Sequence, residues 1–102
     1  MRKKLESADQ FLKTYNQVRA LHKEISALSS KKPDDGINLF KLRFINQILT
    51  EANAVLKKEY IPIKGFQIFE EENLPTNSDV VLILSQYLAC FSRQENDEDS
   101  FL

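Results

Sequence analysis

A chain of 102 residues forms one domain large enough to bury a hydrophobic core, and two glycines, three prolines and no tryptophan are typical of a helical protein with few turns. A single cysteine excludes an internal disulfide and a cysteine-rich zinc site. The net charge of −1 and the isoelectric point of about 5.8 disfavour nucleic-acid binding.

The first predicted helix runs from about Ser7 to Ser30, with the residues from Ser7 to Gln10 as a capping box, although residues 2–6 could extend it upstream. Apolar residues recur on one stripe at helical spacing, namely Phe11, Tyr15, Val18, Leu21, His22, Ile25 and Leu28. The heptad pattern is incomplete, which is typical of a bundle seam and not of a long coiled coil. Leu12 lies outside the stripe. The segment MRKKLESADQ lacks the apolar core of a signal peptide, so we expect a cytoplasmic protein.

A second helix is predicted from about Ile37 to Glu59, after a break at Pro33 to Gly36 whose residues are typical of a turn. So short a connection predicts that this helix lies antiparallel to the first. Its N-cap would be Asp34, Asp35 or Asn38. Apolar residues cover a wide arc, which predicts a middle position in contact with both other helices. A polar stripe lies opposite, formed by Arg43, Asn46, Thr50, Asn53 and Lys57.

The connection between the second and third helices, residues 60–73, is unusually apolar for a surface segment. Its large apolar residues are Ile61, Ile63, Phe66, Ile68 and Phe69. Lys64 and Gly65 could turn a short hairpin, or the segment could be an irregular ordered crossover. We expect these side chains to plug one end of the bundle; the alternative is a partly exposed docking patch, with Phe66 and Phe69 as candidate partner-binding residues.

The third helix is predicted from about Asn77 to Gln94, because Thr76 and Asp79 have the spacing of a capping box. It is the most apolar stretch in the chain, and it is too short to span a membrane. A buried strand at residues 80–84 is the alternative. Leu82 points nearly opposite to the apolar face. We expect a domain over residues 1–94, followed by an acidic, disordered tail over residues 95–102 whose terminal Phe-Leu pair could dock.

Charge is distributed unevenly along the chain. Residues 1–32 carry eight Lys or Arg and three Asp or Glu, whereas residues 65–102 carry one and eight. One interpretation is that the basic first helix packs beside the acidic last third. The other is a dipolar surface that attracts a partner or favours head-to-tail self-association.

Residues capable of chemistry are few and isolated. The only histidine, His22, belongs to the apolar stripe of the first helix, and no nearby residues complete a helical metal site. Cys90 lies within the apolar arc of the third helix, where a free cysteine usually packs as a small hydrophobe. The acidic runs at 34–35, 70–72 and 97–99 lack the spacing of a calcium loop. We therefore expect no enzyme, no cofactor and no metal.

These observations predict an all-α domain of three main helices in an antiparallel bundle, with an ordered apolar crossover between the second and third. The leading functional hypothesis is a non-enzymatic protein-interaction module, such as a small adaptor, a regulatory subunit or a chaperone-like protein. We expect a protein partner and a homo-oligomer, a dimer first, formed through the first or third helix, and no membrane association. The candidate partner-binding residues are Leu12, Leu82, Phe66, Phe69, Arg19 and Lys23.

Two alternative functions use other surfaces. A nucleic-acid-associated regulator would bind through the basic first helix, with Lys13, Arg19 and Lys23 as its cations. A small-molecule-binding domain would use a pocket between the second and third helices. That pocket would be lined by Phe40, Phe44, Tyr87 and Phe91.

Overall fold

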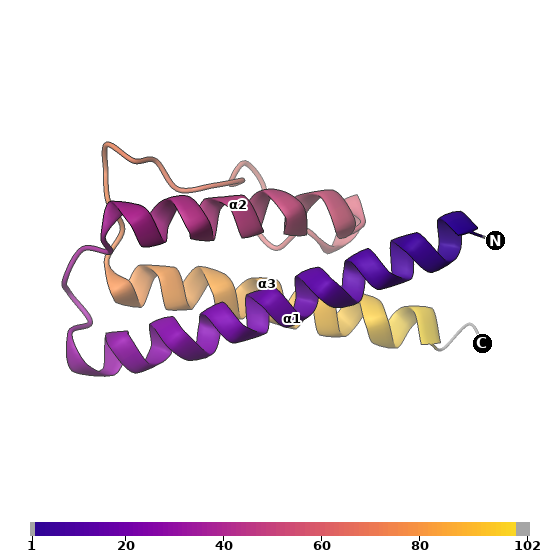
Figure 1. Cartoon of the computed structure of the whole chain (residues 1–102), viewed down its shortest axis with the longest axis horizontal. Coiled ribbons are helices and arrows are strands. Elements are labelled where there is room, and N and C mark those ends of the chain that lie inside the picture. The colour runs from indigo at the N-terminus through magenta and orange to yellow at the C-terminus, as the bar shows by residue number, and fades with distance from the viewer. Residues whose placement is uncertain (1, 100–102) are drawn as a thin grey trace.

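The computed structural model of the chain describes the backbone of residues 2–99 and the side chains of residues 8–97. Three long helices form the bundle: α1 (Arg2–Lys31), α2 (Leu39–Val55) and α3 (Asn77–Asp99), with a short 3-10 helix, η1 (Lys58–Tyr60), after α2. The described backbone contains no strand, so the predicted all-α class is confirmed. α1 runs antiparallel to both α2 and α3 (Figure 1). α2 and α3 run in the same direction, because the segment between them carries the chain back to the end where α2 began.

α1, and not α2, is the helix that packs closely against both of the others, so the predicted middle position of α2 is wrong (Figure 1). The cause lies in the polar stripe of α2, which binds the returning chain and leaves its apolar side for α1. α1 also begins at Arg2 and not at Ser7, so the proposed capping box at Ser7 does not start the helix. At about 1.5 Å per residue, the 30 residues of α1 account for the 45 Å length of the molecule.

The core lies between α1 and the apolar sides of α2 and α3. An aromatic cluster joins α1 to α3: the Tyr15 and Phe91 rings stack at 5.1 Å between centroids, and Phe11 approaches Phe91 at the same distance. Tyr87 is also buried, and its hydroxyl donates to Asn53 Oδ1 of α2 at 2.6 Å. Burial raises the pKa of Tyr87, so this hydroxyl stays a donor.

α2 begins at Leu39, two residues after the predicted start, and of the three candidate caps Asn38 is the one used: its side chain accepts a hydrogen bond from Lys41 N at 2.8 Å. The helix ends at Val55 and not at Glu59. In a longer helix the amide of Lys57 would donate to the carbonyl of Asn53, four residues earlier. Instead it donates to Gln94 Oε1 of α3 at 2.8 Å, so a contact between helices ends α2.

The crossover lies along the outer side of α2 and does not plug an end of the bundle, which corrects the prediction (Figure 1). We call residues 66–71 the strap. Asn46 holds it twice, since Nδ2 donates to Phe69 O and Phe69 N donates to Oδ1, both at 2.9 Å. Asn53 Nδ2 donates to Gln67 O at 2.9 Å. The polar stripe of α2 thus hydrogen-bonds to backbone groups that would otherwise need water.

Of the two alternatives for the crossover, the hairpin does not form, although its turn does. Phe66 N donates to Ile63 O at 3.3 Å, and Gly65 has a φ of 87°, which is typical of the third position of a type II turn. No strand flanks this turn. The backbone of the residues after the turn bonds to side chains of α2. These groups are therefore not available for backbone hydrogen bonds to a second strand.

The α1–α2 connection and the start of α3 are joined by backbone hydrogen bonds at one end of the bundle. Ile37 N donates to Pro75 O and Asn77 N donates to Asp35 O, each at 2.9 Å. Asn77, itself buried, donates from Nδ2 to Lys32 O at 2.8 Å and so satisfies a carbonyl at the end of α1. Two loops far apart in the sequence therefore form one ordered cap.

The predicted capping box of α3 is confirmed. Asp79 N donates to Thr76 Oγ1 and Thr76 N donates to Asp79 Oδ2, both at 3.1 Å. The following residues, 80–84, are helical, so the alternative strand does not form.

We expect Thr76→Ala to lower the free energy of unfolding by about 1 kcal/mol, because an alanine N-cap leaves a first-turn amide without its acceptor. Urea denaturation followed by circular dichroism would measure the change. Gln86→Ala is the control, since Gln86 is exposed in the middle of the same helix. An equal loss in both variants would contradict the capping role.

α3 continues to Asp99 and does not end near Gln94 as predicted. The last turns are held from outside the helix, because the Tyr60 hydroxyl donates to Asp97 Oδ2. That hydrogen bond is the largest cause of the raised pKa of Tyr60. Arg93 lies 4.0 Å from the same carboxylate. The prediction for residues 100–102, including the terminal Phe-Leu pair, lies outside the described residues.

Candidate protein-interaction surface

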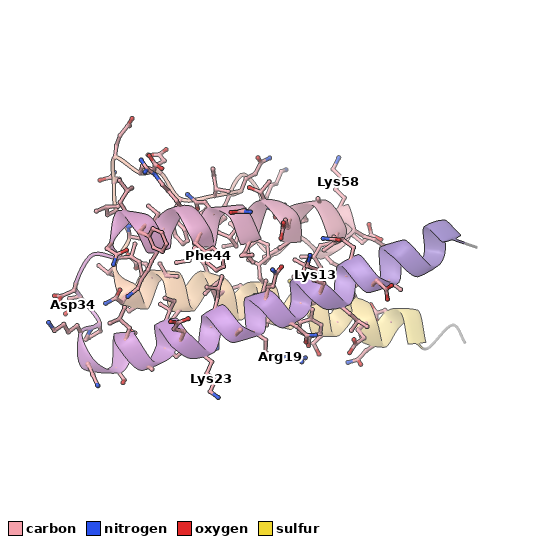
Figure 2. All side chains as sticks on the ribbon, viewed as in Figure 1. Lys13, Arg19, Lys23, Asp34, Phe44 and Lys58 are labelled. Carbon is pink, nitrogen blue, oxygen red and sulfur yellow. The ribbon has the colours of Figure 1, made fainter. Side chains whose placement is uncertain are left out.

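An apolar groove lies between α1 and the N-terminal half of α2, and its volume is about 280 Å³. We call it the Phe40 groove. Its lining residues are Leu21, Glu24, Ile25, Phe40, Lys41, Phe44 and Ile45. Phe40 is 84% exposed and Phe44 is 49% exposed. Figure 2 shows the Phe44 ring on α2, near the end of the bundle where Asp34 lies. Two phenylalanines so exposed beside a groove are typical of an interaction site.

The groove follows from the helical geometry of α2. Phe40 and Phe44 are one turn apart and share a face of the helix. Phe40 lies about 140° around the wheel from Ile45, which is buried in the core. Leu21 and Ile25 of α1 form the buried side of the groove. Phe40 is not among the partner-binding residues that the sequence predicts, because the wide apolar arc of α2 includes it and so predicts its burial. Its angle from Ile45 is the signal that could have identified it.

The rim of the groove carries one charge of each sign. Glu24 of α1 is exposed and Lys41 of α2 is half-buried. Neither forms a salt bridge with another side chain in the described range, residues 8–97. Both charges are therefore available to a molecule that enters the groove.

The six predicted partner-binding residues do not form one surface. Leu12 and Leu82 are 47% and 58% exposed, but they lie on different helices and outside the groove. Phe66 and Phe69 of the strap are half-buried, meet edge to face at 5.1 Å and pack against the core. Single exposed leucines are normal on soluble proteins, so none of these four carries the strongest case for a partner.

The basic residues of α1 point in different directions. Figure 2 shows Arg19 and Lys23 on the side of α1 away from α2, whereas Lys13 lies on the side facing α2. The guanidinium of Arg19 covers the Tyr15 ring, with Cζ 4.2 Å from the ring centroid. The three cations proposed for nucleic-acid binding thus do not share one face.

The four residues proposed to line a small-molecule pocket between α2 and α3 do not lie together. Tyr87 and Phe91 are fully buried against α1 and α2, whereas Phe40 and Phe44 lie at the surface. The four side chains therefore line no common cavity. The groove that Phe40 and Phe44 do line lies between α1 and α2.

The strap and α2 enclose a second, more polar hollow. Arg43 Nε lies 2.8 Å from Glu71 Oε1, and the hydrogen bond from Arg43 lowers the pKa of that carboxyl group. One carboxylate of the acidic run at 70–72 is therefore paired with a cation. This ion pair holds the strap against α2. We therefore assign the hollow a structural role and not a binding role.

The isolated histidine and cysteine have no chemical partners in the described structure. His22 and Cys90 are both half-buried. Burial raises the pKa of the Cys90 thiol, with a weaker opposing effect from Arg93, so the thiolate is disfavoured. Among residues 8–97, no three His, Cys, Asp or Glu side chains gather as a metal site would require. None of the described helices is both long and apolar enough for a membrane span.

The chain matches no known family, no curated protein and no solved structure in three separate comparisons. Function has to be inferred from the surface itself. Within the described part of the chain, the Phe40 groove combines the most exposed aromatic side chain with a hollow beside it.

Proposed function

We propose that this chain is a non-enzymatic protein-interaction module, such as an adaptor, a regulatory subunit or a chaperone-like protein, that binds its protein partner through the Phe40 groove. The single observation that carries the proposal is the 84% exposure of Phe40 beside a hollow lined by Leu21, Ile25 and Phe44. A phenylalanine exposed to this extent forgoes most of its burial energy, about 2 kcal/mol for a complete side chain. A partner that covers the groove recovers it.

The composition of the groove suits a protein partner. Binding energy in protein interfaces comes mostly from a few aromatic or long side chains that enter pockets, while charges at the edge give orientation. Phe40 and Phe44 supply such aromatic groups, and Glu24 and Lys41 supply charges of both signs. At about 280 Å³ the groove is below the usual range for drug-sized ligands and suits one or two side chains.

Photocrosslinking from position 40 would test this proposal. A benzophenone amino acid in place of Phe40 should form covalent adducts with protein in native cells, because this position would lie inside the interface. The matched control carries the same group at Ala27, which is exposed on α1 outside the groove. Adducts specific to position 40 are the expected result. Equal labelling from both positions, or none from position 40, would contradict the proposal.

A further inference from the structure

The Phe40 groove presents a protruding ring and a hollow side by side. Phe40 lines the groove, yet 84% of the residue is exposed, so its ring projects from the rim and does not fill the space. Leu21 and Ile45 also line the groove, and both are buried. Two copies of such a surface can therefore fit together, with the ring of each copy in the hollow of the other.

The charges at the rim complement themselves in the same way. In a two-fold symmetric dimer, residue i of one copy meets residue j of the other, and j meets i. Glu24 comes from α1 and Lys41 from α2, and they line the same groove. Two copies facing each other through this surface can form the pair Glu24–Lys41 twice. In this arrangement each charge faces the opposite charge of the other copy, so the two copies do not repel each other here.

We propose that the occupant of the Phe40 groove is a second copy of this chain, in a two-fold symmetric dimer where each Phe40 enters the other copy's groove. This inference rests on the proposed function and names its partner. It places the dimer contact between α1 and α2, and not on the Leu12 or Leu82 sides of α1 and α3.

The available area is that of a modest dimer. A phenylalanine buries about 200 Å² when fully covered, so the exposed parts of Phe40 and Phe44 in two copies offer roughly 500 Å² of apolar surface. Specific protein interfaces bury at least about 1,200 Å² in total. Leu39, which is also exposed on α2, and the two charged side chains at the rim add further area to that of the rings. We therefore expect a dimer that dissociates on dilution and not a permanent one.

Charge reversal with rescue tests the geometry. Sedimentation of the full chain from about 1 to about 300 μM gives the dimer dissociation constant. E24K and K41E should each raise this constant about fivefold to tenfold, because each places like charges together at two symmetric contacts. The double variant E24K/K41E should restore it to within about threefold of the original chain.

Phe40→Asp should raise the dissociation constant at least about 30-fold, as expected for an aromatic group at the centre of an interface. Leu82→Asp is the matched control, because Leu82 is an exposed apolar residue on α3 outside the groove, and it should leave the constant unchanged. Unaltered circular dichroism of the Phe40 variant would show that the monomer still folds.

Three results would overturn the dimer. They are a monomer at the highest concentration, a dimer that survives Phe40→Asp, or a double reversal that fails to rescue its single variants. A monomer that still forms specific adducts from position 40 would refute the second copy and leave the interaction module standing, with another protein as occupant. A monomer with no adducts would refute both proposals.

Discussion

Phe91→Ala is expected to lower the free energy of unfolding by about 4 kcal/mol, the largest loss among the substitutions considered. Phe91 is fully buried where α3 meets α1, and its ring lies 5.1 Å from those of Phe11 and Tyr15. Removing it leaves a cavity and two aromatic contacts without their partner. Thermal unfolding should show a fall in Tm of more than about 12 °C for a domain of this size.

Leu82→Ala is the control for this loss, since Leu82 belongs to the same helix but is exposed, and its cost should stay within about 0.5 kcal/mol. Phe91→Leu provides an intermediate volume, so its loss should lie between the two and keep the series measurable if Phe91→Ala fails to fold. Equal losses for Phe91→Ala and Leu82→Ala would contradict the position of the core.

Asn46→Ala is expected to cost about 2 kcal/mol and to release the strap. The substitution removes both hydrogen bonds between the Asn46 side chain and the backbone of Phe69, each worth about 1 kcal/mol. Hydrogen exchange should show the amide of Phe69 losing protection, while amides in the middle of α3 change only with the global stability.

Two variants separate the hydrogen bonds from the packing of the strap. Asn46→Asp keeps an acceptor for Phe69 N but places an anion against Phe69 O, so it should cost at least as much as one lost bond. Gln47→Ala, at the exposed neighbouring position, should change neither stability nor exchange by a measurable amount. If Asn46→Ala leaves the exchange of Phe69 unchanged, the strap is held without Asn46, by the packing of Phe66 and Phe69 and by its other bonds to α2, from Asn53 and Arg43.

The start of α3 could be predicted from the sequence because caps are local, and Asn38 was one of three candidate caps for α2. Thr76 and Asp79 are three residues apart, and Asn38 bonds to Lys41 across the same interval. Such bonds need only the backbone of one turn. The ends of the helices were harder to predict. α2 stops where Gln94 binds Lys57, and α3 continues where Tyr60 binds Asp97, both across 37 residues of sequence.

The candidate site was only partly visible in the sequence. The sequence shows the apolar arc of α2, and the width of that arc predicts contact with two helices. The chain instead covers the polar side of α2 with the strap, so the far edge of the arc, including Phe40, remains at the surface. The wheel angle of Phe40 was available from the sequence. The sequence does not show which neighbouring element, if any, covers Phe40.

The sequence by itself determined the all-α class, the break at Pro33 to Gly36 and the capped start of α3, since each depends on spacing within a few residues. Only the tertiary structure decided that α1 is the shared partner of α2 and α3, and that Phe40 stands exposed beside a groove. The physical reason is the strap. Its backbone groups bond to Asn46 and Asn53, and that long-range pairing decides which face of α2 is covered.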